Sequence, residues 1–413
     1  MSEHLQAAAE VAKLARLLNV SPQDLSYLDG LPSAALRAFR DSTTDMLFAR
    51  DSEQLGRVAA SSKMVPIAVA AKGAELAFGP LMCAALSGII EPDRGVAVAT
   101  RLPIPFLAEA AIDMDPRRAT GVISAMPPQT VADVGRVLLG RGEFVTMGRF
   151  VGVLPDASLR AAAPVMSDAD LLRIAFVLED KSGLDKLMEI TSERLPGIIR
   201  AAHDDDLWTE ALDLLDNLSP DSVGRVGDIA AAHDAEVLDS LVRAALRLEA
   251  FDALLPVTRL MQPQSLDRFA EVPAVHEDAV LREILRVALT QGLWRDLLPL
   301  AAKLPTEARA TVAREVANED DAHLTALIRS AHEAGMWDSL IPIALAMSEP
   351  ERQRMAALPL FAESAVLAAI IASAAEHDLW AAVLPLVDAL PPKTRDSVAE
   401  LIAALPEDQR PPV

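Results

Sequence analysis

Five aromatic residues recur at a constant spacing of 43 residues in the second half of this 413-residue chain. They are Trp208, Phe251, Trp294, Trp337 and Trp380, and they include all four tryptophans. A constant spacing of this size is typical of proteins built from repeated helical units. One such unit cannot bury its apolar faces alone, so we expect the units to stack and to share one elongated core.

A block of apolar residues precedes each aromatic in the same register. Its apolar residues stand at positions i, i+3 and i+4, which places them on one face of a helix. An alanine continues that face in each unit, and its small side chain lets neighbouring helices approach closely: Ala202, Ala245, Ala288, Ala331 and Ala374. An arginine closes four of the five blocks: Arg200, Arg243, Arg286 and Arg329.

Two sets of prolines divide each unit further. The first set lies 11 to 13 residues after the aromatic, where a proline ends one helix and opens the next: Pro220, Pro263, Pro305, Pro350 and Pro391. The second set, Pro256, Pro299, Pro342 and Pro385, lies five residues after the aromatic. We expect these prolines in the first turn of a short helix capped by Asp252, Asp296 or Ser339.

Three helices in about 40–47 residues are typical of armadillo and HEAT repeats. We therefore predict an all-α protein in which residues 195–413 form a right-handed α-solenoid of three-helix repeats that resemble armadillo-type repeats.

The first half repeats at a shorter interval. Pro92-Asp-Arg and Pro116-Arg-Arg are 24 residues apart, as are Leu102-Pro103 and Met126-Pro127. In these motifs, residues 90–160 resemble the intracellular N domain of MgtE-type magnesium transporters, a superhelix of short helices. We predict three regions: an N-terminal helical cap with strongly apolar helices (1–90), a short-helix superhelix resembling that domain (91–194), and the armadillo-like repeats (195–413).

Charge and composition limit the classes of partner. The chain has a formal net charge of −22, and residues 196–413 contribute 36 acids against 18 bases. Such a surface repels phosphate backbones, which argues against nucleic acid; it would suit a basic protein partner or simply keep the protein soluble. The single cysteine, Cys83, excludes an internal disulfide. No signal peptide is recognisable, so we expect a cytoplasmic protein.

The stretch from Met64 to Ile90 is long and strongly apolar. Its only charges are Lys72 and Glu75, and Gly79-Pro80 interrupts it. About 20 uninterrupted apolar residues are needed to cross a bilayer. We therefore predict no transmembrane span, and two helices buried in the core.

No constellation of catalytic residues is recognisable, and we expect neither an enzyme nor a bound cofactor. His203-Asp204-Asp205-Asp206 and the stretch from Glu319 to His323 are the richest in metal-binding side chains. Neither has EF-hand or zinc-site spacing. We interpret both as solvated acids at helix starts, where the helix dipole favours negative charge, and predict no metal site.

The repeated arginines, Arg200, Arg243, Arg286 and Arg329, are the candidate partner-binding residues. One interpretation pairs each of them across the turn with an acid that follows the aromatic, such as Glu210 or Asp296. The other places them in a row that lines the concave groove and holds a partner's carboxylates or main chain.

We therefore expect a non-enzymatic scaffold that presents a concave helical-repeat surface to a protein partner. The alternative is a carrier of a hydrophobic small molecule, such as a lipid or isoprenoid, in a cavity formed by residues 64–110. A third hypothesis, a divalent-cation-sensing domain, depends on the resemblance alone.

Overall fold

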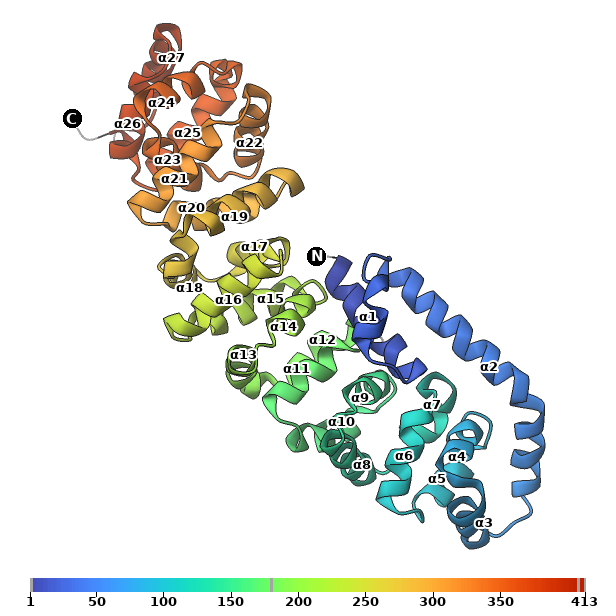
Figure 1. Cartoon of the computed structure of the whole chain (residues 1–413). Coiled ribbons are helices and arrows are strands. Elements are labelled where there is room, and N and C mark those ends of the chain that lie inside the picture. The colour runs from blue at the N-terminus through green and yellow to red at the C-terminus, as the bar shows by residue number, and fades with distance from the viewer. Residues whose placement is uncertain (1–2, 179–180, 407–408, 412–413) are drawn as a thin grey trace. The chain divides into compact units, whose positions relative to one another are not determined.

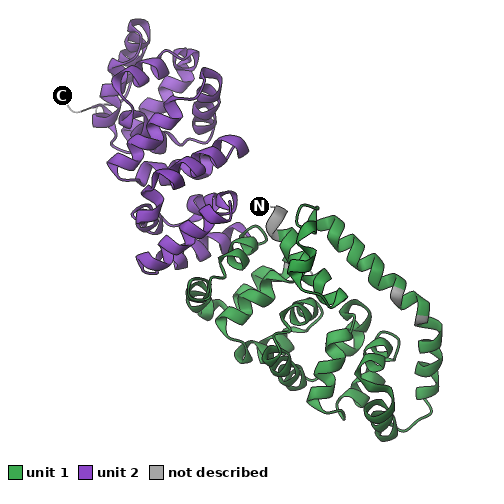
Figure 2. Ribbon diagram, viewed as in Figure 1, with its two compact units in different colours: residues 1–218 green, residues 219–413 purple. Residues whose placement is uncertain are grey.

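The computed structural model describes residues 3–178, 181–406 and 409–411, and these residues form helices and connecting turns without any β-strand (Figure 1). The prediction of an all-α protein is confirmed. The described chain divides into two compact units, residues 1–218 (unit 1) and residues 219–413 (unit 2) (Figure 2).

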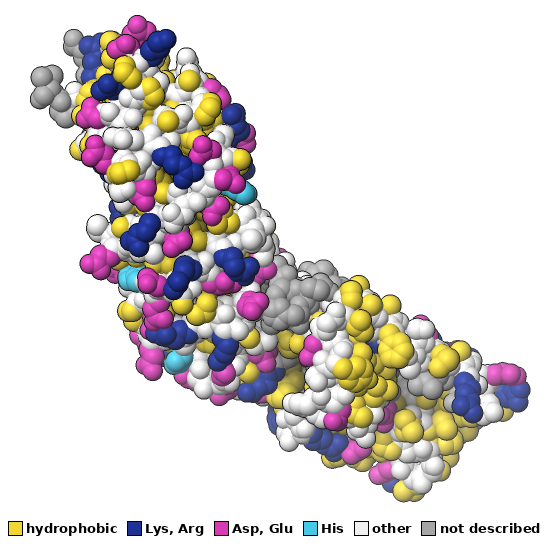
Figure 3. Space-filling view, turned by 45° about the horizontal axis from the view of Figure 1, so that its top comes forward, with side chains coloured by type: hydrophobic (Ala, Val, Ile, Leu, Met, Phe, Trp, Pro, Cys, Tyr) yellow, Lys and Arg dark blue, Asp and Glu magenta, His cyan; other side chains and the backbone are white. Residues whose placement is uncertain are grey.

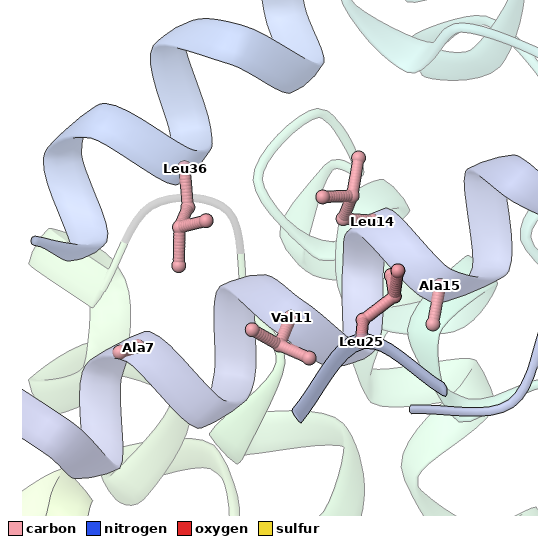
Figure 4. Close-up of a cluster of buried hydrophobic side chains, with 6 residues drawn as sticks. All are labelled: Ala7, Val11, Leu14, Ala15, Leu25 and Leu36. Atoms are coloured by element: carbon pink, nitrogen blue, oxygen red, sulfur yellow. The ribbon is translucent and has the colours of Figure 1, made fainter. Parts of the chain in front are cut away.

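Unit 1 begins with a helix that packs against two of its successors. Helix α1 (Glu3–Leu18), the 3-10 helix η1 (Pro22–Leu28) and the 30-residue helix α2 (Ser33–Ser62) share one apolar cluster. Figure 4 shows this cluster, which consists of Ala7, Val11, Leu14, Ala15, Leu25 and Leu36. Ser21 and Asp24 form the capping box that starts η1, as the serine–proline pair there predicts.

The helices that follow are short, and most have a proline at or next to their first residue, where the missing amide hydrogen costs nothing. Their bounds are α3 (Ile67–Gly73), the π-helix η2 (Ala74–Phe78), α4 (Gly79–Ser87), α5 (Pro92–Ala99), α6 (Ile104–Asp113), α7 (Pro116–Ser124), α8 (Pro128–Gly140), α9 (Phe144–Val151), α10 (Asp156–Ala162), α11 (Asp168–Phe176), α12 (Leu184–Ile190), α13 (Leu195–Asp204) and α14 (Trp208–Leu215). The 24-residue interval appears directly in these bounds, because α5 begins at Pro92 and α7 at Pro116. Gly95 and Gly121 let those two helices approach closely, since an added methyl group would meet Val122 and Pro92 respectively at 2.7 Å.

Unit 2 repeats one order of three helices: a helix that carries the apolar block, a helix that begins at the aromatic, and a helix opened by a proline. In chain order they are α15 (Pro220–Ala231), α16 (Ala235–Arg247), α17 (Phe251–Leu260), α18 (Pro263–Ala270), α19 (Asp278–Gln291), α20 (Trp294–Lys303), α21 (Thr306–Ala317), α22 (Asp321–Glu333), α23 (Trp337–Ala346), α24 (Glu349–Ala356), α25 (Ser364–Glu376), α26 (Trp380–Asp388) and α27 (Pro392–Ala403). The aromatic helices α17, α20, α23 and α26 pack on one another in sequence.

One turn recurs between the block helix and the aromatic helix. The residue two positions before each aromatic has a positive φ, between 52° and 71°: Asp206, Glu249, Gly292, Gly335 and Asp378. The amide of the next residue donates a hydrogen bond of 2.9–3.0 Å to the carbonyl oxygen of the repeated alanine five positions earlier. This is the Schellman geometry that ends helices. Each of those alanines is fully buried.

The second set of prolines lies where we did not expect it. Pro256, Pro299, Pro342 and Pro385 are inside the aromatic helices and not in a first turn. Each of these helices already begins at the aromatic, and its N-cap residue, such as Leu293 or Met336, makes no side-chain cap. The predicted caps at Asp252, Asp296 and Ser339 are therefore wrong.

The aromatic residues differ in burial. Trp208, Phe251, Trp337 and Trp380 are at most 4% exposed, whereas Trp294 is only half-buried. We expect Trp337→Ala to lower the free energy of unfolding by about 3–5 kcal/mol, because it leaves a large cavity. Trp294→Ala should cost clearly less. Chemical denaturation of both variants tests this order, and equal losses would contradict it.

The positive-φ position gives a second prediction. A side chain strains the backbone there, so Glu249→Gly should raise the free energy of unfolding by about 0.5–1 kcal/mol. Gly292 holds the same position 43 residues later, and Gly292→Ala should lower the free energy of unfolding by a similar amount. Urea denaturation measures both changes, and a destabilising Glu249→Gly would mean that the carboxylate contributes more than its strain costs.

Candidate functional site

The candidate arginines lie in the second half of the block helices. Arg200 is in α13 of unit 1, whereas Arg243, Arg286 and Arg329 are in α16, α19 and α22 of unit 2. Arg200 is half-buried, and the side chains of the other three are 48–56% exposed. Unit 2 therefore presents three arginines, one from each of three successive block helices.

Two of these arginines connect successive groups of three helices within unit 2. Arg243 donates two hydrogen bonds to Glu277, of 2.6 and 3.2 Å, and Arg329 donates one of 3.1 Å to Glu363. Each glutamate stands 34 residues after its arginine and is the N-cap residue of the next block helix, α19 or α25. The arginine of one block helix thus contacts the start of the next block helix.

Arg286 makes a different pair. Its guanidinium binds Glu283 on its own helix, and this hydrogen bond holds the pKa of Glu283 below its usual value and raises the pKa of Arg286. The expected pairing across the turn is wrong for Arg286, because Asp296 instead accepts a 2.7 Å hydrogen bond from Arg259. Exposed pairs of this kind contribute at most about 1 kcal/mol each.

The two acidic stretches occupy different parts of their helices. Asp320 caps α22, where its carboxylate accepts a 2.8 Å hydrogen bond from the amide of His323, as predicted for a helix start. His203 and Asp204 instead end α13, and Asp206 lies in the positive-φ turn, so the predicted helix start at residues 203–206 is wrong. Among the residues that the structure describes, no group of three or more histidine, cysteine or acidic side chains is placed to hold a metal ion.

Unit 1 contains a buried charge cluster that the sequence analysis missed. Glu10 and Lys13 of α1 are 2% and 3% exposed and lie 2.8 Å apart. Glu10 also pairs with Arg37 and Arg40 of α2, at 3.0 and 3.1 Å, and Lys13 donates a 3.0 Å hydrogen bond to the carbonyl oxygen of Leu178. The only signal in the sequence is two opposite charges three residues apart within an apolar helix, which also describes many exposed pairs.

A second buried carboxylate, Asp213 of α14, lies in the same unit and pairs with Lys181. Burial raises the pKa of Asp213, and Lys181 offsets only part of that effect. Burial also acts to raise the pKa of Glu10, but Lys13, Arg40 and Arg37 outweigh it, so that pKa is lowered. The protein therefore holds Glu10 ionised more firmly than Asp213.

Glu10→Gln removes the buried carboxylate that pairs with Lys13 and Arg40, while Arg40 keeps its pair with Asp41. We therefore expect a loss of up to about 3–5 kcal/mol in the free energy of unfolding at neutral pH. The folded-state pKa is below the unfolded value of 4.5, so this contribution is present above that pH and disappears as the pH falls through the folded pKa. Thermal denaturation from pH 7 to pH 3 measures it.

Two matched variants control that measurement. Asp213→Asn should cost less than Glu10→Gln, because folding already disfavours the charge of Asp213. Glu53→Gln, in an exposed pair with Arg57, should have no measurable effect. A pH-independent difference between wild type and Glu10→Gln would contradict the electrostatic explanation.

The stretch that we expected to be buried is only partly buried. Helices α3, η2 and α4 run from Ile67 to Ser87, which we name the apolar segment; only 17% of its most apolar window is buried. Leu76 is 77% exposed and Leu81 68%. Gly79, with a φ of 75°, separates η2 from α4 where we predicted the break, but the prediction of burial is wrong.

By length and mean hydropathy alone, the apolar segment is also sufficient to cross a membrane. In Figure 3, hydrophobic side chains gather on the visible face of unit 1.

An apolar cavity of about 60 Å³ lies in unit 2, between helices α23 to α27. Its lining includes Trp337, Phe361 and Val398, and its one charged side chain is Arg352. That guanidinium already donates to the carbonyl oxygen of Met347 at 2.6 Å. The cavity offers space to an uncharged apolar group of a few atoms.

Comparison of the chain with protein-family models, with curated proteins and with solved structures found no match.

Proposed function

We propose that this protein is a non-enzymatic scaffold, an armadillo-like right-handed α-solenoid that binds a protein partner along the block helices of unit 2. The observation that carries this proposal is the set of half-exposed arginine–glutamate pairs on successive block helices. Because an exposed ion pair contributes little to stability, a partner can replace it at a small cost in free energy.

The charge of unit 2 selects the partner. Residues 219–413 carry 30 acids and 17 bases, which attracts a basic protein and repels nucleic acid. When a partner opens the pairs, Glu277 and Glu363 become available to its cations, and Arg243 and Arg329 to its carboxylates or main-chain carbonyl groups. An extended basic segment with occasional acids meets both requirements.

We expect replacement of Arg243 and Arg286 together by alanine to weaken partner binding more than it lowers the melting temperature. The test has two steps: identification of proteins that copurify with the wild type, then calorimetric titration of one of them into wild type and variant. The control replaces Arg268 and Arg314, two exposed arginines of the proline-opened helices α18 and α21, by alanine.

Three results decide between the interpretations. A loss of affinity that is specific to the Arg243 and Arg286 variant supports the proposal. A variant that unfolds at a lower temperature but binds normally once folded shows that these arginines are structural. Equal losses in the test and control variants indicate nonspecific attraction.

A carrier of a hydrophobic small molecule is the second candidate. The cavity between α23 and α27 has room for only a few apolar atoms and lies outside the predicted residues 64–110, so it could hold only part of such a molecule. Organic extraction of the purified protein followed by mass spectrometry tests it, and a stoichiometric apolar compound would support it. The divalent-cation sensor stays a prediction from the resemblance alone.

A further inference from the structure

Exposed large apolar side chains are concentrated in one part of the chain. Of the fourteen such side chains among the described residues, thirteen lie within residues 17–82, and Leu384 is the exception. Six of them lie on or next to the apolar segment: Met64, Val69, Leu76, Phe78, Leu81 and Met82. Monomeric proteins rarely leave such a group of side chains in water, and such groups mark binding surfaces.

The charges of this surface match one another. Lys72 and Glu75 lie one turn apart on the apolar segment and pair at 2.9 Å. Lys63 and Glu91, which flank the segment, pair at 2.7 Å, and both are more than half exposed. The charges on and beside the segment therefore balance, so a second copy meets no net charge there.

We propose that the apolar segment is the interface of a homodimer, with a second copy of this chain as its occupant. In a two-fold interface, residue i of one copy contacts residue j of the other and the reverse contact also forms. Two antiparallel segments related by an axis beside residues 73 and 74 bring Lys72 opposite Glu75 of the second copy. The same arrangement brings Val69 opposite Phe78 of the second copy.

An axis beside residues 73 and 74 places residues 67–80 of one copy opposite the same residues of the other, so α3 and η2 form most of the contact. The exposed small residues Ala68 and Ala77 let two such helical segments approach closely.

A membrane is the less favoured occupant. Helices that lie on a bilayer surface usually carry an excess of lysine and arginine, whereas residues 17–90 carry seven acids and six bases. A segment that crosses the bilayer would also bury Lys72 and Glu75 near its centre. The proposed dimer involves unit 1 and does not depend on the arginine surface of unit 2.

Light scattering during size-exclusion chromatography should give the wild type a mass near twice the 44.1 kDa of one chain. Replacement of Leu76 and Leu81 together by glutamate should abolish the dimer. Both side chains are mostly exposed, so we expect an unchanged thermal melt of the monomer. Tyr27→Glu is the matched control, because Tyr27 is 75% exposed but lies outside the segment, and it should leave the dimer intact.

Charge reversal tests the two-fold arrangement itself. Lys72→Glu and Glu75→Lys each bring like charges together, so each alone should raise the dissociation constant of the dimer on the order of tenfold or more. An equimolar mixture of the two variants should form heterodimers again, because the interface then contains only opposite charges.

Two results would overturn the proposal. One is a wild type that stays monomeric well above micromolar concentration, whether or not it binds phosphatidylcholine vesicles; vesicle binding would assign the segment to a membrane. The other is a dimer that the Leu76 and Leu81 double replacement leaves unchanged. The Arg243 and Arg286 variant should dimerise as the wild type does, so failure here is distinguishable from failure of the scaffold proposal.

Discussion

The turn between the block helix and the aromatic helix fixes the shape of each three-helix unit. Its hydrogen bond joins the amide before the aromatic to the carbonyl oxygen of a fully buried alanine, so the backbone and the packing constrain the same few residues. A larger side chain than alanine would push neighbouring helices apart. The chain accepts backbone strain at Asp206, Glu249 and Asp378 to keep this turn.

The sequence predicted much of the helical order because the relevant signals are local. An aromatic at a constant spacing, a proline that opens a helix and an apolar block with helical periodicity each act within a few residues. The position of Pro256 and its equivalents escaped prediction for a physical reason. We assumed a polar N-cap before each short helix, but the preceding Schellman turn already starts the aromatic helix. The glycines at positions 292 and 335 were the available signal.

The site was less predictable because its partners are distant in sequence. Arg243 and Glu277 are 34 residues apart, and only the packing of α16 beside α19 brings them together. The Glu10 cluster also joins distant residues, because α1 and α2 contribute its opposite charges. The apolar segment escaped prediction for another reason, since its composition predicted burial. Composition reports the affinity of a segment for an apolar environment, but whether this chain or another molecule provides that environment depends on the tertiary structure.

The low burial of the last helices of unit 2 has a consequence for local unfolding. Leu255, Leu298 and Ile341 hold one position of successive aromatic helices and are 1–3% exposed, whereas Leu384 at that position in α26 is 42% exposed. Helix α27 buries only Val398. Few buried side chains hold α26 and α27 in place, so local opening of unit 2 should begin at these two helices. Amide protons of α26 and α27 would then exchange with solvent long before those of α17 and α20, so local stability would decrease along unit 2.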